Sequence, residues 1–198
     1  MAGIISMTVG MSVYAAGGGK TPPAHQWSHS GLFGTFDRAS LRRGAKVYRE
    51  VCSACHGLRL VAYRNLMEIG FSEAEVKAIA SEQEVAAEPN DEGDVEMRPA
   101  ILSDRFVSPF PNENAARAAN GGAYPPDLSL MVKARPDGAN YLRGLLIGYK
   151  EEPPEGVIVP EGMNYNEYYA GNMIAMASPL SEDGVEFADG TKATVEQM

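Results

Sequence analysis

Residues 51–56 read Val51-Cys52-Ser53-Ala54-Cys55-His56, and they include both cysteines of the 198-residue chain. The spacing Cys-x-x-Cys-His is typical of c-type haem attachment. Two thiols one helical turn apart can each add to a vinyl group of the porphyrin and form a thioether bond. His56, directly after the second thiol, then reaches the iron as its proximal ligand. The motif occurs once, so the sequence predicts one covalently bound haem c.

Three other interpretations of the cysteine pair remain open. A zinc half-site needs a second Cys/His pair at ligand spacing, whereas the other histidines, His25 and His29, lie upstream and the chain has no third cysteine. A thioredoxin-like redox pair follows a strand and begins a helix, whereas this motif ends a helix-like run. A chance occurrence in a structural helix would use every cysteine in the chain. The sequence therefore favours covalent haem attachment.

The composition is that of a soluble globular protein, with 44% hydrophobic and 22% charged residues. The chain has 17 basic and 26 acidic side chains and a formal net charge of -9. Such a surface repels phosphate backbones, so we expect no nucleic-acid partner, and it attracts a basic protein. Acidic residues gather between Glu82 and Glu96 with almost no basic counterweight.

The first residues differ in composition from the rest. Met1 to Ala16 are uncharged and mildly apolar, and the first positive charge is Lys20. This pattern resembles the apolar part of a signal peptide without its basic start. We therefore expect residues 1–19 to be a truncated export signal or a disordered leader, and residues 20–198 to form one haem domain.

Hydrophobic periodicity and capping residues predict a mainly α fold with long loop insertions and little β structure. A first helix begins at Asp37 or Ser40 and carries both cysteines to Gly57. A Ser72–Glu75 capping box begins another helix, which runs to about Val85. Residues 82–111 are expected to be loop. The remaining expectations are helices over 60–69, 112–120 and after Asp137, a short hairpin in 157–169, and a final helix from Thr194.

A mono-haem electron carrier usually has a methionine as its second axial ligand, because the neutral thioether favours ferrous iron and raises the reduction potential. Three of the ten methionines lie in the Gly/Asn-rich region after the last long helix: Met163, Met173 and Met176. Small residues flank Met176 and Pro179 follows it. Met173 is its main competitor, and spacing alone does not decide between the two.

Several further segments resemble the cytochrome c1 family, the c-haem subunits of quinol–cytochrome c oxidoreductase (cytochrome bc1) complexes. The resemblance covers roughly Trp27 to Gln197, and its segments follow the family order. They are Trp27-Ser28-His29, Leu41-Arg42-Arg43-Gly44, Val47-Tyr48, Val51 to His56, Val61 to Leu66, Met97-Arg98-Pro99, Leu102-Ser103-Asp104, Asn114 to Asn120, Pro125 to Ser129 and Gly171 to Ala177. The fold that this implies is a c-type cytochrome fold.

The resemblance also implies a set of haem-binding residues. Cys52 and Cys55 correspond to the thioether cysteines, His56 to the proximal ligand and Met176 to the distal ligand. The arginine that contacts a haem propionate corresponds to Arg117. The segment Tyr124-Pro125-Pro126 is expected to lie against the haem.

The family function is electron relay within a quinol–cytochrome c reductase, with no bond-making site in this subunit. The resemblance implies that the haem takes an electron from the Rieske iron–sulfur protein, which obtained it from quinol at the cytochrome b subunit. The electron then passes to a soluble basic cytochrome c, for which Glu82 to Glu96 form a candidate docking surface. The alternatives are a free-standing periplasmic c-type cytochrome that serves another oxidase or reductase, and an interaction module without haem.

The expected location is the periplasmic side of a bacterial inner membrane or the intermembrane-space side of the mitochondrial one. Family members continue with a helix that packs on the N-terminal helix, and then with a membrane anchor. The sequence given ends at Met198, so we expect the anchor to be absent from this stretch.

Overall fold

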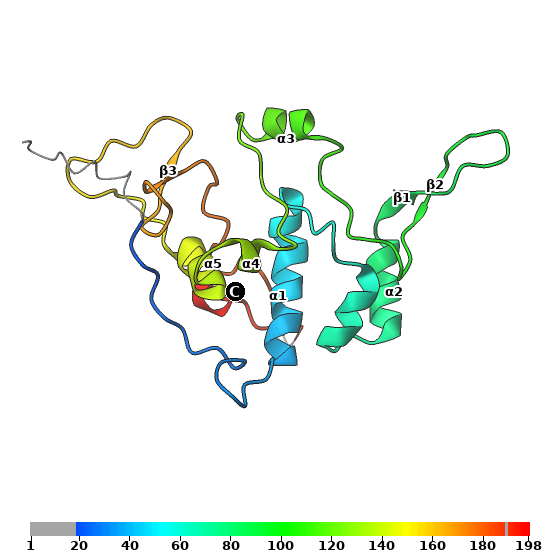
Figure 1. The fold of residues 1–198 in the computed structure, drawn as a ribbon, viewed down its shortest axis with the longest axis horizontal. Coiled ribbons are helices and arrows are strands. Elements are labelled where there is room, and N and C mark those ends of the chain that lie inside the picture. Colours follow the sequence, from blue (N-terminus) through cyan, green and yellow to red (C-terminus); the bar gives the residue numbers. More distant parts are fainter. Residues whose placement is uncertain (1–18, 189) are drawn as a thin grey trace, which may run out of the picture.

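A computed structural model describes residues 19–188 and 190–198 (Figure 1). Over these residues the protein is mainly helical with little β structure, as the sequence predicted; the β structure is two short antiparallel sheets. The expectation about a leader falls, apart from Gly19, outside the described residues. None of the described helices is both long and apolar enough to cross a bilayer.

Helix α1 (Arg38–Glu50) runs through the middle of the molecule (Figure 1). Asp37 caps it by accepting a hydrogen bond from the backbone N–H of Ala39, which confirms one of the two predicted starts. The α-helical part ends at Glu50, earlier than predicted. A 3₁₀ turn, η1 (Cys52–Ala54), then carries the cysteine motif. The tighter turn lets two backbone N–H groups share the carbonyl of Cys52.

On one side of α1, the helix η2 (Tyr63–Ile69) packs against α2 (Glu73–Ser81). Gly70 ends η2 in the left-handed conformation (φ 99°), and the predicted Ser72–Glu75 capping box begins α2. The buried side chains of this region form the first core: Tyr63, Leu66, Val76, Ile79, Ala80 and Ala100.

Two expectations for the next segment were wrong. Helix α2 ends at Ser81 and does not continue to Val85, and residues 82–111 are not entirely loop. Strands β1 (Glu84–Ala86) and β2 (Met97–Pro99) pair with Val85 opposite Arg98. Strands β1 and β2 and the acidic turn between them form a hairpin over residues 84–99, which we call the acidic hairpin. Val85, at its base, packs against the first core, and this apolar contact supports a strand in an otherwise polar segment.

The helices α3 (Glu113–Ala119), α4 (Met131–Ala134) and α5 (Gly138–Ile147) follow, and α5 lies on the opposite side of α1 from α2 (Figure 1). Strand β3 (Asn164–Tyr165) pairs with β4 (Met173–Ile174), so the partner strand lies beyond the hairpin predicted in 157–169. The final helix predicted from Thr194 is one 3₁₀ turn, η3 (Val195–Gln197). A second core contains Val47, Leu180, Val185 and Ala193.

Candidate functional site

The cysteine motif lies directly after α1 in a closely wound turn. The backbone N–H of His56 donates to the Cys52 carbonyl at 2.8 Å, and the N–H of Cys55 donates to the same oxygen at 3.1 Å. Both cysteines are free thiols and partly buried. Burial, with a smaller contribution from Cys55, raises the pKa of the Cys52 thiol. The turn therefore presents two thiols and an imidazole from adjacent positions.

The His56 ring is oriented by the segment that was expected to lie against a haem. Its Nδ1 lies 2.7 Å from the carbonyl oxygen of Pro126. A carbonyl only accepts hydrogen bonds, so Nδ1 carries the hydrogen and Nε2 carries the lone pair. A second hydrogen bond, from the Tyr48 hydroxyl to the His56 carbonyl at 2.9 Å, holds the main chain. The residues present thus fit a metal-binding imidazole whose free nitrogen is Nε2.

Residues 126–129 pack against the chain just after the cysteine motif, at the buried Gly57. The Leu128 N–H donates to the Gly57 carbonyl at 2.9 Å, and Asp127 accepts a bond from the N–H of Arg59 at 2.8 Å. A Cβ on Gly57 would lie 3.1 Å from Asp127 Oδ2 and 3.2 Å from Ser108 Oγ, so a larger residue here would require both side chains to shift slightly. Burial acts to raise the pKa of Asp127, but hydrogen bonds from Ser129 and Arg59 outweigh it and lower the pKa.

The segment around Met176 is held by its main chain. The Met176 carbonyl accepts hydrogen bonds from the Tyr149 hydroxyl at 3.0 Å and from Asn164 Nδ2 at 3.3 Å. Burial raises the pKa of Tyr149 to about 12. A tyrosine hydroxyl is protonated at neutral pH even without this shift, so it can donate. Met173 lies in strand β4, whereas Met176 lies in the loop that follows it.

The loop that carries Met176 returns to α1. Leu180 is buried in the second core with Val47 of α1, and Val51 packs against the same cluster. Val51 directly precedes Cys52 in the chain. The structure therefore packs the end of the Met176 loop against the helix that directly precedes the cysteine motif.

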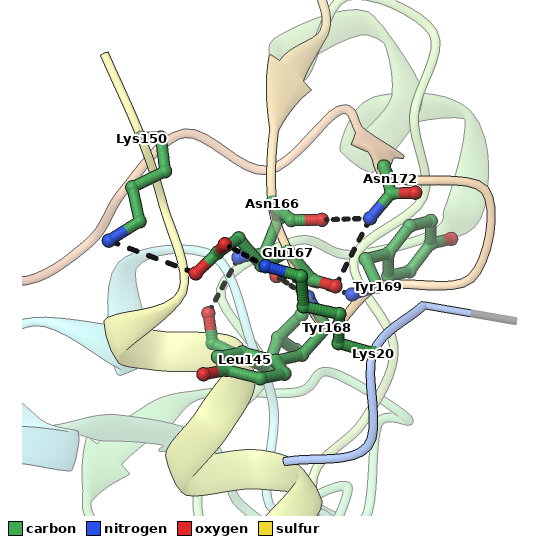
Figure 2. Close-up of polar contacts among 8 residues, drawn as sticks. All are labelled: Lys20, Leu145, Lys150, Asn166, Glu167, Tyr168, Tyr169 and Asn172. Carbon is green, nitrogen blue, oxygen red and sulfur yellow. Dashed lines mark hydrogen bonds and ion pairs between the residues drawn. The ribbon is translucent and has the colours of Figure 1, made fainter. Parts of the chain in front are cut away.

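Asn166 organises the chain before Met176, and the sequence analysis missed it. It is fully buried. Its Nδ2 donates to the Leu145 carbonyl at 2.7 Å, and its Oδ1 accepts from the backbone N–H groups of Tyr168 and Tyr169 at 3.0 and 3.2 Å (Figure 2). The only sequence signal was an Asn-rich stretch, which is typical of turns.

Arg117 and Tyr124 lie together on and just after α3. The Arg117 guanidinium binds Glu113 Oε1 through Nη2 at 2.7 Å and the Gly122 carbonyl through Nη1 at 2.9 Å. It also lies 5.5 Å from the centre of the half-exposed Tyr124 ring. The propionate contact of Arg117 stays a prediction, and a propionate would have to compete with Glu113 for the guanidinium.

The histidines that a zinc site would require are engaged elsewhere. The His29 ring stacks on Phe36 at 4.7 Å, and His25 meets Trp27 edge-on at 4.6 Å. Across residues 19–188 and 190–198, no three His, Cys, Asp or Glu side chains gather in a metal-binding group. Within the described residues, neither His25 nor His29 joins Cys52 and Cys55 in such a group.

The sequence matches that of known proteins over most of its length. The sequence model of the Cytochrome C1 family covers residues 27–198. The chain is 55% identical to a mitochondrial "cytochrome b-c1 complex catalytic subunit" of Candida albicans, over 93% of this chain and 64% of that protein. It is 48% identical to a mitochondrial "cytochrome c1 1, heme protein" of Arabidopsis thaliana, over 99% of this chain and 64% of that protein.

A bacterial relative is similar in the same way. The chain is 48% identical to the "cytochrome b/c1" protein of Bradyrhizobium diazoefficiens, over 91% of this chain and 29% of that longer protein. The chain thus spans 64% of the length of the Candida and Arabidopsis relatives. The family match nevertheless includes the cysteine motif, the Pro125–Ser129 segment and Met176. The chain belongs to the cytochrome C1 family.

Proposed function

We propose that this chain is the haem-bearing, electron-relaying part of a quinol–cytochrome c reductase. The observation that carries the proposal is the orientation of His56, whose Nδ1 is committed to the Pro126 carbonyl, so that Nε2 is the ligand nitrogen. The haem-attachment cysteines stand on the same turn. Relatives named as haem proteins and as a subunit of the cytochrome b-c1 complex support the assignment.

In this proposal one haem c is held by residues 20–198 acting as a single domain. Cys52 and Cys55 form the thioether bonds, His56 supplies the proximal nitrogen and Met176 supplies the distal sulfur. When bound, the haem supplies one-electron chemistry between ferrous and ferric iron. His56 and Met176 would hold the iron in both oxidation states, so little would have to move during transfer. Tyr124, Pro125 and Pro126 would line the haem, and Arg117 would contact a propionate.

The proposed electron path runs from the Rieske iron–sulfur protein, through this chain, to a soluble basic cytochrome c. The chain would stand beside a cytochrome b subunit, on the periplasmic or intermembrane-space side of the membrane. The acidic hairpin supports the choice of a basic acceptor, because its carboxylates are exposed. They are Glu84, Glu88, Asp91, Glu92, Asp94 and Glu96; Glu82, just before the hairpin, is also exposed but pairs with Arg49.

The ligand assignment is tested by comparing Met176→Leu with Met173→Leu in the full-length protein. Met176→Leu should keep the covalent haem but lower the reduction potential and open a coordination position, because Leu offers no lone pair. Met173→Leu is the matched control and should change neither. Visible spectra with a pyridine haemochrome assay and a potentiometric titration give the readouts. An unchanged potential in Met176→Leu rejects the distal assignment, and wild-type protein without covalent haem rejects the function.

The acceptor is tested by electron-transfer kinetics with a basic cytochrome c. The second-order rate should fall as ionic strength rises, because salt screens the attraction between opposite charges. The double variant Glu88→Gln with Glu92→Gln should slow transfer at low salt, whereas Glu186→Gln, far along the chain, should not. A rate that does not respond to salt argues against docking on this hairpin. Failure to copurify with cytochrome b and the Rieske protein would favour the free-standing cytochrome.

A further inference from the structure

The carbonyl oxygen of Met176 is held by two side chains that come from different elements. Tyr149 follows α5, and its hydroxyl reaches the oxygen at 3.0 Å across 27 residues of sequence. Asn164 begins β3, and its Nδ2 reaches the same oxygen at 3.3 Å. A carbonyl oxygen has two lone pairs. Both are therefore used by donors that do not belong to the loop itself.

The elements that carry these donors are bonded to each other. The Glu167 N–H donates to the Gly148 carbonyl at 3.0 Å, and the Lys150 N–H donates to the Tyr165 carbonyl at 3.4 Å. Asn166, directly after β3, donates through Nδ2 to the Leu145 carbonyl of α5 at 2.7 Å (Figure 2). The end of α5 with the residues just after it, and the end of β3 with the residues just after it, thus form one hydrogen-bonded unit. The hydrogen bonds of Gly148 and Lys150, on either side of Tyr149, fix the main chain from which its hydroxyl reaches Met176.

The two proposed axial ligands depend differently on such support. His56 directly follows Cys55, which in the proposed function is covalently bound, and its ring is also held by the Pro126 carbonyl. Met176 has no covalent attachment and lies in the loop after β4. Its sulfur stays in place only if the main chain around it is ordered. Release of the loop gains backbone entropy, so contacts to the main chain have to oppose that release.

On the basis of the proposed function, we infer that Tyr149 is a positioning residue for the distal ligand. Its hydroxyl, with the Asn164 amide, holds the Met176 carbonyl and keeps the methionine sulfur in the ligand position. Loss of the hydroxyl favours the released loop, in which an external nitrogen ligand replaces the sulfur. That exchange breaks one bond to the iron and forms another, and no electron is transferred.

The experiment measures imidazole binding to the ferric, full-length, haem-loaded protein. Tyr149→Phe should bind imidazole about tenfold more tightly than wild type, because one hydrogen bond no longer opposes release of the loop. Its sulfur-to-iron absorption band should weaken and its reduction potential should fall. Tyr63→Phe is the matched control, since Tyr63 is a buried tyrosine in the first core, away from this loop. It should leave all three readouts unchanged.

Tyr149→Phe that matches wild type in all three readouts would overturn the inference. If that variant does not fold, Asn164→Ala removes the other donor and should shift imidazole binding in the same direction. No shift in Asn164→Ala would then overturn it. Failure of the proposed function looks different, because wild-type protein would carry no covalent haem or would lack the sulfur-to-iron band.

Discussion

Each side of α1 contains an apolar core, but the segment before Met176, on the α5 side, is ordered largely by polar contacts. On the side of η2 and α2, the first core consists of apolar side chains such as Leu66 and Val76. On the side of α5, the segment before Met176 is ordered by polar side chains that bond to main-chain groups, with Asn166 at the centre. The first kind of order follows hydrophobic periodicity. The second depends on individual hydrogen bonds, so single polar substitutions should disturb it most.

The largest expected effect is on the apolar side. Leu66→Ala should lower the free energy of unfolding by about 3 kcal/mol, because it removes buried methyl groups and leaves a cavity. Leu66 is 6% exposed. Met67→Ala, at the neighbouring and 38% exposed position, is the control and should cost much less. Urea unfolding measures both changes. Equal losses in the two variants would contradict an apolar core centred on η2 and α2.

Asn166→Ala should have a somewhat smaller but local effect. We expect a loss of about 2 kcal/mol, because the Leu145 carbonyl and the Tyr168 and Tyr169 N–H groups lose their partner. Amide hydrogen exchange should accelerate in residues 166–176 and stay unchanged in α2. Asn90→Ala is the matched control, since Asn90 Oδ1 also accepts two backbone N–H groups but in an exposed turn. Faster exchange in α2 would refute a local role.

The smallest effect is a pH dependence at the edge of the apolar side. The Arg42 guanidinium, with help from Ser72, lowers the pKa of Glu75 from 4.5 to about 2. A pKa that is lower in the folded state adds stability above the unfolded value, and this is lost as the pH falls from about 4.5 to about 2. Glu75→Gln should therefore be less stable than wild type at pH 7 and show a smaller loss on acidification.

Glu73→Gln serves as the control for this titration, because Glu73 pairs with Lys77 alone on the same helix. Its acid dependence should be closer to that of wild type. Thermal unfolding across this pH range provides the measurement. Identical acid profiles for wild type and Glu75→Gln would show that the Arg42 ion pair does not contribute.

The sequence predicted features that depend on neighbouring residues. The cap at Ser72 was identified correctly and Asp37 was one of two predicted starts, since an N-cap bonds to backbone groups two or three positions ahead. Asn112, predicted as the first residue of a helix, is the N-cap of α3. Both short sheets were missed or misplaced. The pairing of Val85 with Arg98 crosses an acidic turn, and that of Tyr165 with Met173 crosses a loop held by Asn166. Local polarity does not reveal such pairings.

The candidate site divides in the same way. The spacing of Cys52, Cys55 and His56 can be identified from the sequence alone, because these residues are neighbours in the chain and suit haem attachment whatever the tertiary structure around them. Only the tertiary structure decided that the Pro126 carbonyl takes His56 Nδ1 and that Tyr149 holds Met176. Those hydrogen bonds join residues distant in sequence. Their partners exist only once the packing of the helices and strands brings them within about 3 Å.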